Sequence, residues 1–154
     1  MLGDHATESE AETEALGAAL WKTLHAPGCV LLEAPLGTGK TTLVRGLLRA
    51  AGHEGAVPSP TYAIVQPYEG LGGGAPPLYH LDLYRLNSAS ELAELGLDDM
   101  LDHGIVLAEW PERAAGWWPQ DALRVAGTML GDGRRSWRIG PDGPGGSGGK
   151  RDEG

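Results

Sequence analysis

The sequence predicts an α/β domain, and three observations carry the prediction. Short apolar runs typical of buried strands alternate with segments of helical periodicity through the first two-thirds of the chain. The chain has 154 residues, 41% of them hydrophobic, which is enough for one domain with a substantial core. No run of about 18 apolar residues occurs, so no transmembrane helix is expected. We therefore expect a single domain over residues 1–139 and a disordered Gly- and Pro-rich tail over residues 140–154.

The first third of the chain is expected to fold as helix, strand and helix. Residues 1–8 are expected to be frayed. Ser9 and Glu12 match a capping box that opens a helix. Leucines every four residues give this helix an apolar stripe to about His25, namely Leu16, Leu20 and Leu24. A buried strand is predicted over residues 29–32, and a second helix over residues 40–51.

The rest of the chain is expected to hold five strands and two short helices. A surface loop rich in glycine and proline is expected over residues 70–77, and Gly131-Asp132-Gly133 is expected to form a hairpin turn. The strands are expected at 61–65, 78–83, 105–108, 123–126 and 136–139, and the helices at 90–95 and 98–102.

Charge and cysteine content restrict the environment and the partners. The formal net charge is −9, so the chain is expected to repel the phosphates of RNA and DNA rather than bind them directly. Cys29 is the only cysteine, which excludes an internal disulfide, and its apolar neighbours predict a buried packing residue. The acidic N-terminus lacks the apolar segment of a secretory signal. A cytoplasmic location fits these features.

One glycine-rich loop gives the strongest functional signal. Ala34-Pro35-Leu36-Gly37-Thr38-Gly39-Lys40-Thr41 matches the pattern G-x-x-x-x-G-K-[ST], except that Ala34 and Pro35 stand at its start. Backbone N–H groups of such a loop converge on phosphate oxygens, the lysine reaches the outer phosphates, and the hydroxyl binds Mg²⁺. A predicted strand precedes the loop and a helix follows it. We therefore expect ATP with Mg²⁺ to bind here, at Leu36, Gly37, Thr38, Gly39, Lys40, Thr41 and Thr42.

Two acids at strand ends are candidates for the metal or the attacking water. Asp82 ends the apolar run 78–82, and Glu109 ends the run 105–109. Ligands bind at the carboxyl ends of strands in such sheets, so both carboxylates are expected near the nucleotide. The pattern does not rank them, and each is also compatible with a solvated residue where a strand exits.

Four further features are weaker signals. Thr61 follows Ser59-Pro60 and offers a hydroxyl to the γ-phosphate or Mg²⁺, although the segment alone predicts only a turn. His80 is expected to point to the opposite sheet face from Asp82 and to serve in packing. Trp110 fits either a position near the nucleotide or the core. Trp117-Trp118 is expected to take part in hydrophobic packing.

Further motifs occur in a fixed order around the loop. Thr13-x-x-Leu16-Gly17 precedes it, and after it come Val57-Pro58-Ser59-Pro60-Thr61-Tyr62, His80-Leu81-Asp82-Leu83-Tyr84-Arg85, Glu94-Leu95-Gly96 and Gly104-Ile105-Val106-Leu107-Ala108-Glu109-Trp110-Pro111-Glu112. With this order and spacing, residues 9–126 resemble the TsaE (YjeE) family, the small ATPases of bacterial tRNA threonylcarbamoyladenosine synthesis.

The resemblance implies a fold, an activity and partners. The fold would be that of a P-loop NTPase, with a mixed, mainly parallel sheet flanked by helices. The chain would hydrolyse ATP weakly and reset a complex of TsaD and TsaB between turnovers, reaching tRNA only through that complex. Trp110 would lie by the nucleotide, and Thr61 would belong to a switch-like loop. The resemblance implies catalytic roles for Lys40, Thr61, Asp82 and Glu109, and metal binding by Thr41, Asp82 and Glu109.

Other functions remain open at this stage. A small-molecule kinase is also built on such a loop, but it usually carries an arginine-rich lid, and only the isolated Arg113 is a candidate for one. A GTPase is disfavoured because no Asn-Lys-x-Asp motif is present. A binding module without catalysis is disfavoured because Lys40, Thr41, Asp82 and Glu109 are all retained.

Overall fold

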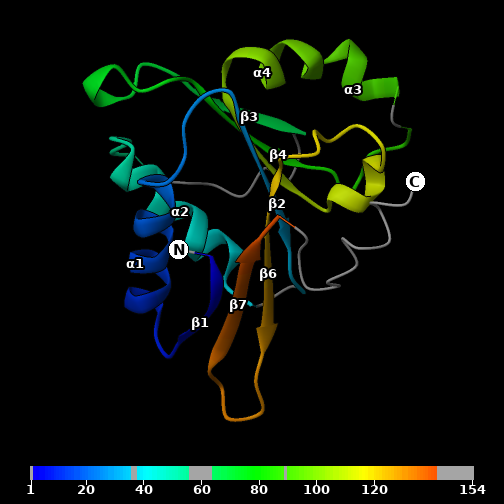
Figure 1. Ribbon diagram of the computed structural model, residues 1–154. Coiled ribbons are helices and arrows are strands. Elements are labelled where there is room, and N and C mark those ends of the chain that lie inside the picture. The colour runs from blue at the N-terminus through cyan, green and yellow to red at the C-terminus, as the bar shows by residue number, and fades with distance from the viewer. Residues whose placement is uncertain (1, 36–37, 56–63, 89, 142–154) are drawn as a thin grey trace.

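The computed structural model describes residues 2–35, 38–55, 64–88 and 90–141, which form a mixed α/β fold around one sheet (Figure 1). The strands lie in the order β1-β7-β6-β2-β5-β4-β3. The four central strands β6, β2, β5 and β4 are parallel, and antiparallel strands lie at both edges. Their bounds are β1 Gly3–Thr7, β2 Gly28–Glu33, β3 Val65–Tyr68, β4 Leu78–Asp82, β5 Ile105–Glu109, β6 Leu123–Met129 and β7 Arg135–Gly140.

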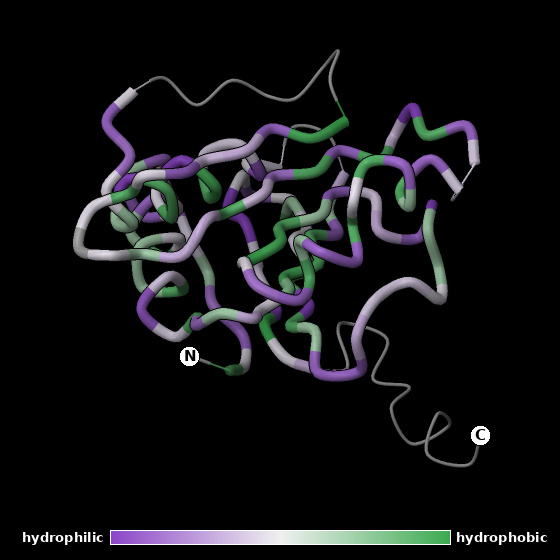
Figure 2. The backbone as a smooth tube through the Cα atoms, turned by 90° about the horizontal axis from the view of Figure 1, so that it is seen from above, coloured by the Kyte–Doolittle hydropathy of each residue, from purple (hydrophilic) through white to green (hydrophobic). Residues whose placement is uncertain are grey.

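Helices cover both faces of the sheet. On one face α1 (Glu10–Trp21) and α2 (Lys40–Ala50) pack on a cluster of leucines and valines with Trp137. On the other face α3 (Ser90–Glu94), α4 (Leu97–His103) and the 3₁₀ turn η2 (Pro111–Ala114) cover a second cluster. Figure 2 shows the hydrophobic segments gathered in the interior and the hydrophilic ones at the periphery. None of the described helices is long and apolar enough to cross a membrane.

The local signals for α1 and the hairpin are confirmed. The Ser9 hydroxyl accepts the N–H of Glu12, which satisfies one of the amides that a helix start leaves without a partner, and the Glu12 carboxylate accepts the N–H of Glu8, the residue before the N-cap. The helix itself ends at Trp21 and continues as a turn. The expected hairpin turn joins β6 to β7, closed by the N–H of Leu130 to the carbonyl of Arg134.

The N-terminal segment is not frayed, and the expectation for residues 1–8 was wrong. Residues 3–7 form β1, which pairs antiparallel with β7 from Gly3 opposite Ile139 to Thr7 opposite Arg135. The segment Gly-Asp-His-Ala-Thr has no apolar run to indicate a strand. Its structure depends on a backbone ladder with a partner some 130 residues away, which no local pattern reveals.

Most of the strand expected at 61–65 lies outside the described residues. Of its two described residues, Ile64 is not in a strand, and Val65 begins the edge strand β3, Val65–Tyr68. Residues 56–63 lie outside the described part of the chain, as do residues 142–154 of the expected tail. The other strands agree within a few residues. Trp117 and Trp118 pack against the second core cluster, as predicted.

Cys29 is a buried packing residue, as expected, and its thiol should be inert. Burial raises its pKa to about 12 from 9.0, helped by the charge of Asp121. Because the thiolate is the reactive form, we expect alkylation by iodoacetamide at pH 8 to be about 1,000-fold slower in the folded protein than after denaturation. Mass spectrometry of the single adduct measures both rates. Equal rates would show that Cys29 is accessible and ionisable.

The two helices α1 and α2 meet at Gly46, where a side chain has no room. A Cβ at this position would lie 2.1 Å from the carbonyl oxygen of Glu14. In an open helix, alanine is about 1 kcal/mol more favourable than glycine. A loss of stability in the alanine variant therefore comes from the steric clash. We expect Gly46→Ala to lower the free energy of unfolding by about 3 kcal/mol in urea titrations. The control is Gly131→Ala, where nothing lies within 4 Å and no loss is expected.

Candidate functional site

The candidate site lies where the carboxyl ends of β2, β4 and β5 meet the start of α2. Gly39 is the N-cap of α2 and has φ 106° and ψ 25°, a left-handed conformation that favours glycine. Gly39 has no side chain that could cap this helix. The N–H groups of the first turn therefore stay available to an anion, and the helix dipole favours negative charge there. Thr41 and Thr42 lie half-buried in that first turn.

Lys40 and Glu109 form a buried ion pair at this edge of the sheet. The Lys40 ammonium is 3.5 Å from Oε1 of Glu109, and the two side chains are only 7% and 6% exposed. Asp82 is the neighbour of Glu109 across the parallel pair β4–β5. Asp82 Oδ1 accepts the N–H of Tyr84, which fixes the turn that leaves β4. The structure thus brings Lys40, Asp82 and Glu109 together.

His80 belongs to this group as well, and the expectation that it faces away from Asp82 was wrong. Residues two apart in a strand share a face, so His80 and Asp82 both lie on the side of α1 and α2. His80 Nε2 is 2.6 Å from Oε2 of Glu109, and the ring is 1% exposed. Its role is therefore polar, whereas the sequence suggested packing.

Trp110 follows Glu109 in a strained conformation. Its φ of 59° and ψ of 49° are left-handed, the one such non-glycine residue in the described ranges. Residues held this way cost about 1–3 kcal/mol and cluster at functional sites. The conformation turns the indole toward Lys40, whose ammonium lies 5.0 Å from the ring centroid. The Tyr84 ring also packs on the indole, with centroids 5.0 Å apart.

The two neighbouring carboxyl groups have pKa values shifted in opposite directions. Burial opposes the charge of Glu109, but the hydrogen bond from His80 and the ammonium of Lys40 outweigh it and lower its pKa. Burial raises the pKa of Asp82, and the nearby charge of Glu109 raises it further. Glu109 is therefore an ionised acceptor, and Asp82 is a carboxylate that a cation would stabilise.

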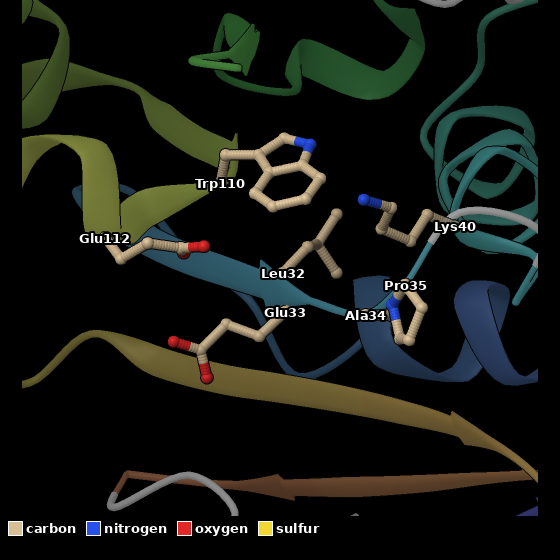
Figure 3. Close-up of a pocket in the computed structure, with 7 residues that line it drawn as sticks. All are labelled: Leu32, Glu33, Ala34, Pro35, Lys40, Trp110 and Glu112. Carbon is tan, nitrogen blue, oxygen red and sulfur yellow. The ribbon is translucent and has the colours of Figure 1, made fainter.

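A cavity of about 400 Å³ opens beside these groups (Figure 3). In Figure 3 the Lys40 ammonium points toward the indole of Trp110 above Leu32, and the carboxylates of Glu33 and Glu112 lie away from Lys40. The lining residues are Leu32, Glu33, Ala34, Pro35, Lys40, Trp110 and Glu112. A second cavity of about 360 Å³ shares Glu33 and Glu112 with it.

The remaining predicted site residues are distributed as follows. Thr38 is buried, with its methyl group close to Gly127 of β6. Leu36, Gly37 and Thr61 lie outside the described residues. Glu33 and Glu112 were missed by the sequence reasoning, yet Glu33 ends an apolar strand in the same way as Asp82 and Glu109. That pattern would have found it.

Comparison with known proteins decides the family. A family model described as "Threonylcarbamoyl adenosine biosynthesis protein TsaE" matches residues 7–136. The chain belongs to the TsaE family. The family takes part in tRNA threonylcarbamoyladenosine biosynthesis, and the resemblance expected from the sequence is thereby confirmed.

Individual TsaE relatives agree with the family model. The chain is 43% identical to the TsaE protein of Streptomyces coelicolor over 111 residues, which cover 71% of this chain and 74% of the relative. It is 38% identical to that of Bacillus subtilis over 131 residues, which cover 84% and 79%. The crystal structure of Bacillus subtilis YdiB matches with a TM-score of 0.75 and 27% identity, covering 89% of this chain and 84% of YdiB.

Proposed function

We propose that this TsaE family member binds ATP with Mg²⁺, hydrolyses it weakly, and thereby acts on a complex of TsaD and TsaB. The observation that carries the proposal is the convergence of Lys40, Asp82 and Glu109 at the start of α2, beside a cavity. A cation, two carboxylates and an open helix N-terminus at one edge of a parallel sheet suit phosphoryl chemistry. The fold we propose accordingly is that of a P-loop NTPase.

The residues present fit a nucleoside triphosphate. The cavity of about 400 Å³ lies within the usual range for small-ligand sites. The Lys40 ammonium and the uncapped first turn of α2 supply positive charge for the phosphates. Trp110 contributes an aromatic face to the cavity wall. The loop residues Leu36, Gly37, Thr38 and Gly39, with Thr41 and Thr42, would surround the phosphates.

The residues also fit Mg²⁺. Among the described residues no group of three or more His, Cys, Asp or Glu side chains could hold a metal alone. Mg²⁺ does not need such a cage, because it usually binds one or two carboxylates together with substrate phosphates and water. Thr41, Asp82 and Glu109 offer the hard oxygen ligands that it prefers. Bound there, the ion would neutralise charge on the β- and γ-phosphate oxygens.

The protein side chains have separate tasks in this proposal. Lys40 binds the outer phosphates, and Asp82 orients the metal shell. Glu109 is ionised and lies beside both, so it holds or deprotonates the attacking water. Thr61 contributes its hydroxyl from the neighbouring loop. Hydrolysis would be slow until a partner completes the site.

The proposed partners are proteins rather than RNA. The net charge of −9 opposes direct binding to tRNA, so tRNA would be reached through TsaD and TsaB. We place the activity in the cytoplasm with those partners. The kinase alternative gains no support from Arg113, its one candidate lid residue, because the guanidinium stacks 5.5 Å from the centre of the Tyr84 ring.

Phosphate release with and without TsaD–TsaB tests the proposal. We expect slow Mg²⁺-dependent release from ATP by the chain alone and a clear stimulation by the complex. The paired assay is threonylcarbamoylation of tRNA in a mixture of purified components with and without this chain. A rate unchanged by the complex, together with full tRNA modification in the absence of this chain, would refute the proposed function.

A further inference from the structure

The two carboxylate oxygens of Glu109 contact two different side chains. Oε1 lies 3.5 Å from the Lys40 ammonium, and Oε2 lies 2.6 Å from His80 Nε2. A carboxylate oxygen accepts, so we assign the short contact as a hydrogen bond in which Nε2–H donates to Oε2. The contacts use different oxygens, and one can therefore break while the other stays.

We propose that His80 is a positioning residue that keeps the Glu109 carboxylate in place when Lys40 leaves it for the nucleotide. The inference rests on the proposed function, because it assumes that phosphates take over Lys40. It adds a role for His80. It also adds a step in which Lys40 exchanges its ion pair with Glu109 for contacts with the phosphates of the nucleotide.

The geometry shows which of the two contacts is exchanged. The Lys40 side chain has a flexible stem and lines the cavity, and its ammonium is 3.5 Å from Glu109. A triphosphate carries several negative charges against the single charge of one carboxylate, so it attracts the ammonium more strongly. The contact from His80 is shorter, and His80 itself lies on strand β4 with only 1% of its surface exposed. It is therefore the contact that persists.

The surroundings of His80 support a role at Glu109. The other ring nitrogen, Nδ1, is buried and has no hydrogen-bonding partner among the described residues. Buried polar atoms are normally paired, so a ring placed only for packing would be better replaced by an apolar side chain. The hydrogen bond to Glu109 is thus the interaction that accounts for a histidine at this position of β4.

Two substitutions at His80 separate the hydrogen bond from the ring. The amide nitrogen of glutamine is as many bonds from Cα as Nε2, whereas that of asparagine corresponds to Nδ1 and falls short of Glu109. We expect His80→Asn to lower kcat for ATP hydrolysis by about 10- to 100-fold. KM and the Kd of a fluorescent ATP analogue should change less than about threefold. His80→Gln should stay within about fivefold of wild-type kcat.

A second readout needs no nucleotide. Thermal unfolding of the single variants His80→Asn and Glu109→Met, the second of which removes the acceptor oxygens, and of the double variant forms a double-mutant cycle. We expect the double variant to unfold at a higher temperature than the sum of the two single shifts predicts, because each single change leaves a buried partner unpaired. Additive shifts would mean that the pair is not coupled, which would overturn the inference.

The remaining outcomes are also decisive. A His80→Asn variant with raised KM and unchanged kcat would place His80 in binding and overturn the inference. So would a His80→Gln variant as impaired as His80→Asn, because the ring shape would then matter and not the donor. If His80→Asn does not fold, His80→Phe, which keeps a ring and removes the N–H donor, takes its place in the kinetics and in the cycle. A wild-type protein that neither binds nor hydrolyses ATP would refute the proposed function itself, while the nucleotide-free cycle still tests the coupling.

Discussion

Lys40→Ala is expected to weaken ATP binding by about 100-fold and to reduce turnover at least as much. Lys40 is 7% exposed and lies beside the cavity, so its ammonium would meet phosphate in a partly desolvated site. Removing such a charge-assisted contact costs about 3 kcal/mol, which is a factor of about 100 in affinity. Titration with a fluorescent ATP analogue and phosphate release measure the two effects.

Controls separate the lost charge from a damaged fold. Lys40→Ala leaves Glu109 buried with one partner fewer, and removing one member of a buried pair also destabilises the protein. The double variant Lys40→Met with Glu109→Gln removes both charges at nearly constant volume, and it should regain stability but not ATP binding. Lys22→Ala changes an exposed lysine after α1 and should leave both properties unchanged. Wild-type affinity in Lys40→Ala would show that the loop is not the nucleotide site.

Asp82→Asn is expected to reduce Mg²⁺-dependent turnover by about 100-fold while nucleotide binding without metal persists. The amide keeps the oxygen that accepts the Tyr84 N–H, so the turn after β4 survives. It loses the charge that would hold the metal shell, and metal stabilisation of a phosphoryl transition state supplies several kcal/mol. Phosphate release over a Mg²⁺ titration measures the loss, and tight binding of the ATP analogue in EDTA shows that the cavity is intact.

The hairpin offers a matched control for this substitution. Asp132 Oδ1 accepts the N–H of Arg134 two residues later, which is the same local geometry as at Asp82, but on the exposed turn between β6 and β7. Asp132→Asn should therefore leave turnover unchanged. If Asp82→Asn is as active as Asp132→Asn, Asp82 has no part in metal-dependent chemistry, and Glu109 with Thr41 must hold the ion alone.

Local patterns in the sequence were sufficient for much of the fold. The capping box at Ser9, the apolar runs of β2, β4 and β5, and the glycine turn between β6 and β7 each depend on residues within one element. Strand β1 was missed because its polar residues order only through pairing with β7. Strand β3 extends beyond the expected end at Val65 to Tyr68 for a related reason, since these residues pair with β4.

At the candidate site, too, some features follow from local sequence patterns and others from pairing between distant strands. The order of the motifs identified the family, and the P-loop pattern indicated Lys40 as its central charge, because both are properties of short segments. Which groups meet was decided by the parallel pairing of β4 and β5, which sets Asp82 beside Glu109 and brings His80 to the Glu109 carboxylate.

What the sequence determined by itself is therefore the kind of chemistry and the segments that carry it. Only the tertiary structure decided that Lys40, His80 and Glu109 form one connected group beside a cavity, with Trp110 turned toward the ammonium. The physical reason is that side-chain type and periodicity act over a few residues, whereas hydrogen bonds and ion pairs at this site join residues up to 69 positions apart, from Lys40 to Glu109.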